Sequence, residues 1–335
     1  MTDVLDAVEA GLVRRKPLLA RLLAEQTDCV RLFHGIAEGV PGLTVDRYGP
    51  ILLVQTQASR PSAREGDIAA IAELVRRALD VDLVLTWNVR GAPREAQPPL
   101  ARTLAPELAV GLELGLRFDV RPRHRGQDPL LFLDFRVARR RVRALAEGRS
   151  VLNLFAYTCG VGVAAARGGA SEVWNVDFAT SALEVGRRNA EINGLDSRRF
   201  RTIEADVIPT VRQLAGLPVK GRGARRSFER FAPRSFDLVV LDPPRWAKTP
   251  FGAVDVVNDY PSLLKPAIGC ARPGGLVLAS HHVPGTSREA FAAVVRRTAE
   301  KSGRGLRALE VFGPEEDFPS FDGEPPLKIA VAEVE

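Results

Sequence analysis

A glycine-bearing turn carries the first pattern in this sequence that suits a chemical function. Residues 160–165 are Gly-Val-Gly-Val-Ala-Ala, after an apolar segment that we expect to form a strand and at the start of an expected helix. Glycine lets the backbone approach a ligand, and the N-terminus of a helix offers free N–H groups. Sites for NAD and for S-adenosylmethionine share this need. A tight turn that requires glycine for its own geometry would give the same pattern.

Three carboxylates at the ends of expected strands distinguish between these two cofactors. Asp177 ends the second strand, where a carboxylate can accept both ribose hydroxyls of either cofactor. Asp206 follows the third strand, at the place where methyltransferases hold the adenine amino group, and Asp242 ends the fourth. Each acid alone is also typical of a helix cap or a solvated surface group. Because doubly wound sheets bind ligands at the carboxyl ends of their strands, the three together predict an S-adenosylmethionine site.

The elements that position these residues alternate between strand and helix from residue 150 onward. This alternation is typical of a parallel, doubly wound sheet. The expected strands are 150–155, 172–177, 200–204, 236–241, 276–280, 306–312 and 327–334, and the clearest expected helices are 180–193 and 287–301. The sequence therefore predicts an α/β fold, with a seven-stranded, doubly wound, Rossmann-like methyltransferase domain over residues 121–335.

Residues 1–120 have a different pattern, which predicts a small α+β domain. An amphipathic helix is expected over 3–25, with a kink or a split at Pro17, and a second helix over 65–79. Short strands are expected at 43–45, 51–55 and 83–87, and a β-hairpin at 108–120. Recognition of RNA or of another substrate is our hypothesis for this domain.

Composition limits the class of protein. The chain has 335 residues, 45% of them hydrophobic and 26% charged, and no apolar run approaches the roughly 18 residues of a membrane span. The three cysteines are too few and too scattered for a disulfide framework or a metal cluster. We therefore expect a cytoplasmic protein with no membrane partner and no metal. The net charge of +6 favours polyanion binding only modestly, because arginine-rich chains are common wherever coding DNA is rich in G and C.

Several short runs give the chain a family resemblance. They are Phe-Leu-Asp-Phe-Arg at 132–136, Asn-Leu-Phe-Ala-Tyr-Thr at 153–158, Asn-Gly at 193–194 and Asp-Pro-Pro-Arg at 242–245, preceded by Arg-Leu-Phe-His-Gly at 31–35 and by residues 41–49. In these runs the chain resembles the bacterial 23S ribosomal RNA methyltransferases that use S-adenosylmethionine, a family that groups cytosine-5 enzymes with a guanine-N7 branch. The small PUA domain that opens the cytosine-5 members is not expected here, because only about thirty residues precede Arg31.

The resemblance also implies the residues of the site. Asn153, Phe155, Tyr157 and Gly160 would form the turn beneath the methionine part of the cofactor, Asp177 and Phe178 would hold the ribose and the edge of the adenine, Asp206 and Val207 would meet the adenine, and Asp242, Pro243 and Pro244 would line the methyl-transfer site. Arg136 would pair with the cofactor carboxylate, or it would be a solvated arginine on a basic helix. Cys159 stands in the cofactor turn where the family has glycine, which questions the geometry of that turn.

The acceptor chemistry follows from a missing thiol. Cytosine-5 methylation needs a thiolate that attacks the base, and the cytosine-5 members carry it in Ser-Cys-Ser after the fifth strand. This chain has Ser280-His281-His282 there, and neither Cys159 nor Cys270 is well placed. The sequence therefore favours transfer to a ring nitrogen without a covalent adduct. The two histidines would hydrogen-bond the base or accept a proton, with His281 as our candidate catalytic residue, or they would be structural.

Two further features suit an RNA partner. Trp246, next to the Asp-Pro-Pro run, would stack on an extruded base or pack its loop against the core. Six cations surround Phe228 and Phe231 before the fourth strand, where they would contact phosphates or belong to a solvated insertion. They are Lys220, Arg222, Arg225, Arg226, Arg230 and Arg234.

The leading hypothesis is a methyltransferase that acts on RNA, with large-subunit ribosomal RNA as its substrate. The cofactor half of the chain would be the same in a methyltransferase of a small molecule or of a protein. An NAD-dependent oxidoreductase is a second alternative, which equilibrium dialysis against both cofactors would separate. A non-catalytic RNA-binding ribosome-assembly factor is a third, and it would bind RNA without turnover. The sequence does not indicate the oligomeric state.

Overall fold

Two compact units make up the chain. The computed structural model describes residues 4–59, 62–100, 102–122, 128–219 and 227–335. The first unit comprises Met1–Arg136 together with a return segment, Glu315–Gly323. The second comprises Val137–Pro314 and Glu324–Glu335. The chain therefore leaves the second unit after Pro314, contributes the return segment to the first, and goes back for its last strand.

Four strands form the sheet of the first unit, in the order β1-β2-β3-β4. They are β1 (Cys29–His34), β2 (Thr44–Tyr48), β3 (Ile51–Gln57) and β4 (Val84–Arg90). β2 is antiparallel to β1 and β3, whereas β4 pairs parallel to β3 after the crossover helix α2 (Glu65–Leu79). The unit also contains 3-10 helices η1 (Arg94–Ala96) and η2 (Leu133–Phe135) and a hairpin of β5 (Val110–Glu113) and β6 (Leu116–Asp119). The predicted hairpin and α2 are confirmed, and β1 is a strand that the sequence analysis missed.

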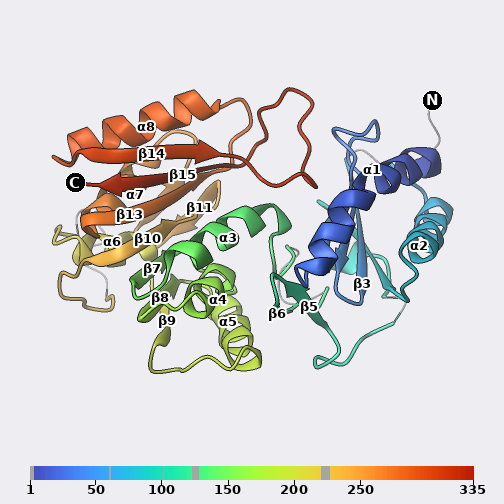
Figure 1. The fold of residues 1–335 in the computed structure, drawn as a ribbon, viewed down its shortest axis with the longest axis horizontal. Coiled ribbons are helices and arrows are strands. Elements are labelled where there is room, and N and C mark those ends of the chain that lie inside the picture. The colour runs from blue at the N-terminus through green and yellow to red at the C-terminus, as the bar shows by residue number, and fades with distance from the viewer. Residues whose placement is uncertain (1–3, 60–61, 101, 123–127, 220–226) are drawn as a thin grey trace. The chain divides into compact units, whose positions relative to one another are not determined.

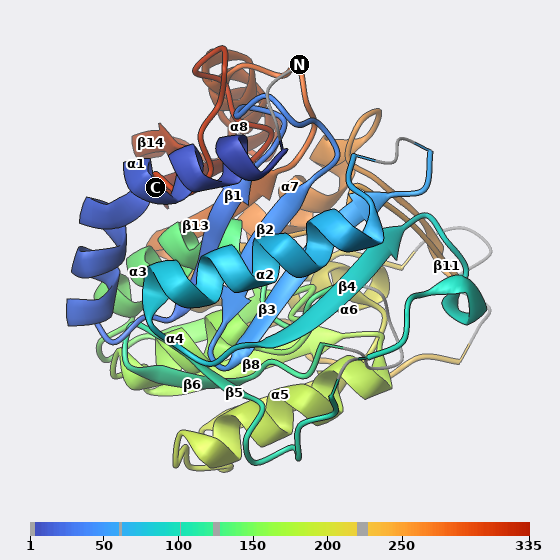
Figure 2. The same cartoon turned by 90° about the vertical axis from the view of Figure 1, so that its right-hand side faces the viewer.

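Helix α1 (Val4–Ala24) packs with α2 against this sheet, and Figure 2 shows α2 crossing in front of the strands. α1 supplies Val8, Leu12 and Leu22 to the core of the unit. Pro17 lies inside the helix, which continues through it. Proline lacks an N–H and crowds the preceding turn, and Figure 2 shows the helix bending along its length. The predicted kink is confirmed, and the predicted split is wrong.

Seven strands form the sheet of the second unit, in the order β14-β15-β13-β10-β7-β8-β9 (Figure 1). They are β7 (Ser150–Leu154), β8 (Glu172–Asp177), β9 (Phe200–Glu204), β10 (Phe236–Leu241), β13 (Ala271–His281), β14 (Leu306–Phe312) and β15 (Lys328–Val334). The strands from β13 to β9 in this order are parallel, and β15 is antiparallel to both of its neighbours. The predicted α/β fold with a seven-stranded, doubly wound sheet is confirmed.

The strand order of this sheet changes direction at β7. The helices are α3 (Arg136–Leu145), α4 (Gly160–Arg167), α5 (Thr180–Ile192), α6 (Val207–Leu214), α7 (Tyr260–Gly269) and α8 (Arg288–Lys301), and a hairpin of β11 (Trp246–Thr249) and β12 (Gly252–Asp255) follows β10. From β7, the sheet continues through β8 on one side and through β10 on the other. Ligands of doubly wound sheets bind where the order reverses in this way, so the loops after β7 and β10 frame the expected site.

Candidate functional site

The turn that leaves β7 has an unusual backbone. Phe155, Tyr157 and Cys159 are all left-handed, with φ of 59°, 49° and 60°. Such values are uncommon in residues other than glycine, and each costs about 1 to 2 kcal/mol. Residues in sparsely populated conformations cluster at ligand sites, where the surrounding structure holds them in place. Three of them in five positions therefore make this turn a candidate functional element.

Cys159 answers the question that the sequence raised about the cofactor turn. It caps the N-terminus of α4 in the left-handed conformation that glycine adopts easily, so the turn geometry is kept with a different residue. Its buried thiol lies against Gly186 of α5, where an added Cβ would be 2.4 Å from Sγ. Its N–H donates to the carbonyl of Ala156 over 2.7 Å. Cys159 thus supports the turn through its buried side chain, which packs against α5. We remove it from the residues proposed to contact the cofactor.

Three asparagines and a glycine support the same turn. Asn153 in β7 donates from Nδ2 to Asn175 Oδ1 in β8 over 2.9 Å. An added Cβ at Gly162 would lie 2.0 Å from that Asn175 oxygen, so glycine is required there for the packing of α4 on the sheet. Asn189 in α5 donates to the carbonyl of Thr158 over 3.0 Å. These contacts position the backbone of the turn, with Gly160 at the start of α4.

Asp177, at the end of β8, ties the turn to the neighbouring strand. Its Oδ2 accepts a hydrogen bond from the N–H of Tyr157, and its Oδ1 accepts one from the N–H of Ala179, each over 2.8 Å. Burial raises the pKa of this carboxyl group, and the backbone hydrogen bonds oppose that effect. A carboxylate has about four lone-pair positions, so these two bonds leave room for ribose hydroxyls. The adjacent Phe178 is 47% exposed and is free to cover a flat ligand.

Asp206 has an unsatisfied oxygen. Its Oδ1 caps α6 by accepting the N–H of Ile208 over 2.9 Å. Its Oδ2 is buried and has no hydrogen-bond partner among the residues that the structure describes. Leaving a buried acceptor unpaired costs about 1 to 3 kcal/mol, which an N–H donor from a ligand would recover. The amino group of adenine is such a donor, so this residue fits an adenosyl ligand. The neighbouring Val207 lies in the core.

The end of β10 carries a hydrogen-bonded cluster. Asp242 Oδ1 accepts the hydroxyl of Ser280, from the end of β13, and lies 2.8 Å from His282 Nε2. The hydroxyl of Tyr260 in turn donates to the carbonyl of Ser280 over 2.8 Å. The side chains of Asp242 and His282 are 25% and 31% exposed, so a substrate can reach them. Pro243 is buried directly after Asp242 and limits the freedom of the carboxylate's backbone.

His281 is not part of this cluster, and its assignment as the candidate catalytic residue is corrected. It is buried, with its ring centroid 5.5 Å from that of Tyr260 and 5.1 Å from that of Phe291. Burial and the charge of Lys328 lower its pKa to about 4. Side chains alternate along an extended chain, so His281 at the end of β13 and His282 directly after it point to opposite sides. His282 is the residue that faces Asp242, and His281 is a neutral packing residue.

Arg136 also has a different role from either of those expected. Its side chain is fully buried within the first unit, so it is not a solvated arginine. Nη2 donates to Asp317 over 2.6 Å, Nε to Glu315 over 2.7 Å, and Nη1 to the carbonyl of Cys29 over 3.0 Å. Because its charge is neutralised by two acids of the return segment, it has little left to offer a cofactor carboxylate. We therefore leave Arg136 out of the proposed cofactor site.

All three thiols are buried. Burial raises the pKa of Cys270 to about 12, and its thiol lies 3.5 Å from the carbonyl of Val211. Burial also raises the pKa of Cys159 and of Cys29.

In the described part of the chain, no group of three or more His, Cys, Asp and Glu side chains is arranged to hold a metal ion. No helix among the described residues is long and apolar enough to cross a membrane.

Trp246 is 63% exposed, so it does not pack its loop against the core, and its stacking on an extruded base stays a prediction. Of the six predicted cations, Lys220, Arg222, Arg225 and Arg226 lie outside the described residues. Arg230 is solvent-exposed, with its guanidinium 4.3 Å from the centroid of the Phe228 ring. Arg234 lies 4.6 Å from the centroid of the Trp174 ring, at the edge of the core.

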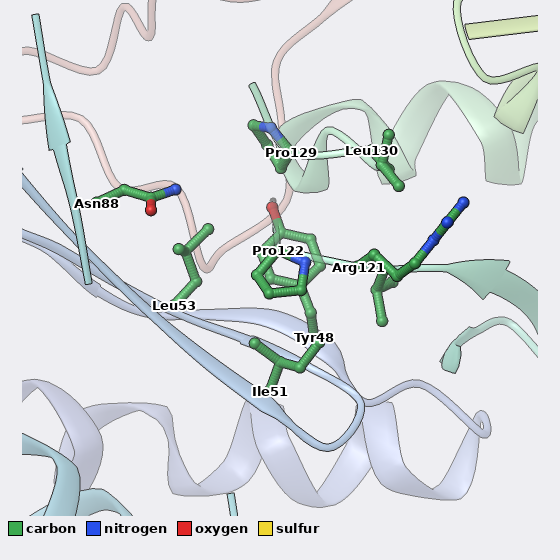
Figure 3. A pocket seen from close by; sticks show the side chains of 9 residues that line it. Tyr48, Ile51, Leu53, Asn88, Arg121, Pro122, Pro129 and Leu130 are labelled. Carbon is green, nitrogen blue, oxygen red and sulfur yellow. The ribbon is translucent and has the colours of Figure 1, made fainter. Parts of the chain in front are cut away.

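One small cavity in the first unit has no room for a cofactor or a nucleotide. Figure 3 shows it between Tyr48, Ile51 and Leu53 of the sheet and Pro129 and Leu130 of the segment before η2. Its volume is about 10 Å³, which is room for roughly one water molecule. Such a space is a small packing defect beneath a loop.

Comparison with known proteins identifies relatives over nearly the whole chain. Residues 107–331 match the family described as S-adenosylmethionine-dependent methyltransferase. The chain is 35% identical over 312 residues to a ribosomal RNA large subunit methyltransferase of Deinococcus radiodurans, which covers 90% of this chain and 71% of that protein. It is 28% identical over 323 residues to ribosomal RNA large subunit methyltransferase I of Aeromonas hydrophila, which covers 92% of this chain and 72% of that protein.

Two solved structures with a similar fold are described as methyltransferases, one of them as putative. A putative methyltransferase complexed with SAH matches with a TM-score of 0.78 and 23% identity, over 98% of this chain and 80% of that chain. An S-adenosylmethionine-dependent methyltransferase from Agrobacterium tumefaciens matches with a TM-score of 0.62 and 17% identity, over 92% of this chain and 90% of that chain. At these identities the likeness establishes the fold.

Proposed function

Because this chain belongs to the family of S-adenosylmethionine-dependent methyltransferases, we propose that it methylates RNA, with the 23S ribosomal RNA of the large subunit as its substrate. The Deinococcus radiodurans relative supports this substrate, since the similarity covers 90% of the chain and so includes most of the first unit as well as the cofactor half. The buried, unpartnered oxygen of Asp206 carries the assignment of the cofactor site. The NAD alternative is dropped because the family uses S-adenosylmethionine.

The proposed cofactor residues surround the carboxyl ends of β7, β8 and β9. Asp177 accepts hydrogen bonds from the ribose hydroxyls, Asp206 Oδ2 accepts one from the adenine amino group, and Phe178 covers the adenine. The turn through Tyr157 and Gly160 lies beneath the methionine part, where α4 offers its first N–H groups. When bound, the cofactor supplies an electrophilic methyl group on a sulfonium.

The proposed acceptor is a ring nitrogen, and no covalent adduct forms. A ring nitrogen has a free lone pair, so correct placement of the base can supply most of the catalysis. Buried thiols with raised pKa values are poor nucleophiles, which supports a mechanism without cysteine. Asp242 is the charged group at the end of β10, where it is suited to stabilise positive charge that develops on the methylated base. Ser280 and His282 hold its Oδ1 in place.

The division of the chain at residues 120 and 121, with RNA recognition by the N-terminal part, stays a prediction.

Two other hypotheses stay open beside RNA methylation. A methyltransferase of a small molecule or a protein would share the cofactor residues, and a ribosome-assembly factor would share the RNA affinity. Neither is favoured by a specific contact in the structure.

Methyl transfer from radiolabelled S-adenosylmethionine tests the proposal. Purified protein is offered large-subunit ribosomal RNA from a strain that lacks the gene, transfer RNA, and a panel of proteins and small molecules. We expect label in the large-subunit RNA, and an N-methylated nucleoside by mass spectrometry after digestion. Label only in protein or small-molecule acceptors would overturn the RNA substrate. RNA binding without any turnover would leave the assembly-factor hypothesis.

A further inference from the structure

The β11–β12 hairpin has one face in the core and one face in solvent. Ala247 in β11 pairs with Val254 in β12, Val254 is fully buried, and both pack in the core of the second unit. Because side chains alternate along a strand, Trp246 and Lys248 lie on the opposite face of β11, and both are exposed. β11 is labelled in Figures 1 and 2. A large aromatic ring and a cation are therefore presented side by side to solvent.

Two exposed cations stand close to Trp246 in the chain. Arg245 precedes Trp246 and is exposed, as is Lys248. Asp255, which pairs with Trp246 across the hairpin, is occupied within its own loop. Its Oδ1 accepts the N–H groups of Val257 and Asn258 and its Oδ2 accepts the Asn258 amide. The Asp255 carboxylate is thus held by donors of its own loop, and the exposed side chains of Arg245 and Lys248 can meet a ligand.

A second aromatic–cation pair lies at the tip of the hairpin. The turn residue Phe251 meets Phe228 edge to face, with ring centroids 5.5 Å apart. Arg230 places its guanidinium 4.3 Å from the centroid of the same Phe228 ring. The base of the hairpin is fixed as well, because Val256 donates from its N–H to the carbonyl of Arg245 over 3.1 Å. The hairpin is therefore a platform that is fixed at its base and at its tip, and an aromatic ring and a cation lie near each of these ends.

The platform lies next to the methyl-transfer site. Trp246 follows Asp242 by four residues, so their Cα atoms are at most about 14 Å apart. A nucleobase that stacked on Trp246 would be part of the same strand as the acceptor base or its near neighbour. An exposed tryptophan at a catalytic edge has little value for folding, because it leaves most of its apolar surface in water.

We propose that the outward face of the β11–β12 hairpin binds an unpaired segment of the acceptor RNA, with Trp246 stacked on a base and Lys248 against a phosphate. The proposal rests on RNA being the substrate. Stacking requires an unstacked base, which a loop, bulge or single strand offers and a continuous duplex hides. A duplex would use the lysine but not the tryptophan. The site therefore selects single-stranded over paired RNA.

Binding of labelled RNA to tryptophan and lysine variants tests this inference. Fluorescence anisotropy gives the Kd for a single-stranded oligonucleotide and for a fully paired hairpin of matched composition. Trp246→Ala should weaken the single-stranded complex about tenfold and leave the paired one nearly unchanged. Trp246→Phe should retain most of the affinity, because phenylalanine still stacks. Lys248→Ala should lower the slope of log Kd against log salt by about 0.7 for one lost phosphate contact.

Matched controls separate stacking from general surface effects. Phe321→Ala removes another exposed aromatic ring, at 77% exposure, and Lys301→Ala removes an exposed cation at the end of α8. Neither should alter the Kd for single-stranded RNA, and no variant should alter the Kd for the cofactor. Wild-type affinity in Trp246→Ala, or an equal loss for single-stranded and paired RNA, would overturn the inference while the RNA substrate stands. A wild-type protein that binds neither RNA and methylates another acceptor would overturn both.

Discussion

His282 Nε2 lies 2.8 Å from Asp242 Oδ1, and this contact joins the ends of two adjacent parallel strands. The same oxygen accepts the hydroxyl of Ser280. Both donors approach Oδ1, so in the proposed mechanism the other oxygen of Asp242 faces the base. A carboxylate held by two neighbours needs little reorganisation when charge develops next to it, and this is how fixed groups stabilise a transition state.

His282→Ala should therefore slow methyl transfer more than it weakens binding. We expect kcat to fall about 100-fold, because Asp242 would lose one of the two side chains that orient it. KM for RNA and the Kd for the cofactor should change little. His282→Gln, whose amide N–H can replace the imidazole donor, should recover part of kcat. An equal fall in both variants, or a loss that appears only in KM, would show that His282 does not act through Asp242.

The sequence located Asp242 but not its partner, and the reason is physical. An acid at the end of an apolar strand is visible from periodicity alone, because the strand pattern fixes both the end and the edge of the sheet. Which of two consecutive histidines faces that acid depends on where β13 ends. Element boundaries are the least determined feature of a sequence pattern, and a shift of one residue exchanges the two faces.

His281 gives a pH-dependent contribution to stability. Its pKa is lowered to about 4 from an ordinary value of about 6.5, so the unfolded chain takes up this proton at a higher pH than the folded chain. Stability is then unaffected above pH 6.5 and falls as the pH drops towards 4, by up to about 1.4 kcal/mol per pH unit. His281→Phe keeps an aromatic ring between Tyr260 and Phe291 but cannot titrate. Urea unfolding between pH 5 and 7 should show a shallower loss in the variant, and equal slopes would contradict the assignment.

The proposed hydrogen bond from the adenine amino group to Asp206 Oδ2 can be tested by replacing that acceptor with an N–H donor. Asn is as good a helix cap as Asp, so Asp206→Asn should keep the cap on α6 and the thermal stability. Its amide group, however, would present N–H donors where Oδ2 now accepts. We expect calorimetry to show S-adenosylhomocysteine bound about tenfold more weakly, since a hydrogen bond to a charged group is lost.

An inosine analogue of the same ligand completes this test. It carries a carbonyl oxygen in place of the adenine amino group, and therefore needs a donor from the protein. The variant should bind the analogue better than the wild type does. Weaker binding of both ligands by the variant would mean that Asp206 does not contact the adenine edge.

Arg136 should contribute to stability rather than to cofactor affinity. Arg136→Met leaves Asp317 buried within the first unit without its ion-pair partner, which costs about 3 to 5 kcal/mol of unfolding free energy. A second substitution in the same chain, Asp317→Asn, removes the buried charge that has lost its ion-pair partner and should recover part of the lost unfolding free energy. Cofactor affinity, measured on folded protein, should be unchanged in both variants. Loss of that affinity at unchanged Tm would return Arg136 to the cofactor site.

This arginine shows what sequence patterns leave out. Its partners Glu315 and Asp317 lie about 180 positions further along the chain, in a return segment that has no helical or strand period. An arginine among other arginines on a basic helix gives no local sign of burial. The strands and the three strand-end acids were predictable because apolar periodicity is local, whereas this ion pair depends on a tertiary contact.

The proposed transfer without a covalent adduct can be tested at Cys159 and Cys270. Both thiols are buried, and burial raises their pKa values, so neither is a thiolate near neutral pH. Cys159→Gly suits the left-handed turn and Cys270→Ala keeps a small apolar group, so both variants should fold and retain most of their methyl transfer. RNA substituted with 5-fluorocytosine traps enzymes that attack cytosine through cysteine, because the fluorine blocks release of the adduct. We expect no covalent complex on a denaturing gel with the wild type, at a concentration where unsubstituted RNA is methylated. A stable complex that disappears in either variant would restore a cytosine-5 mechanism and displace the ring-nitrogen acceptor.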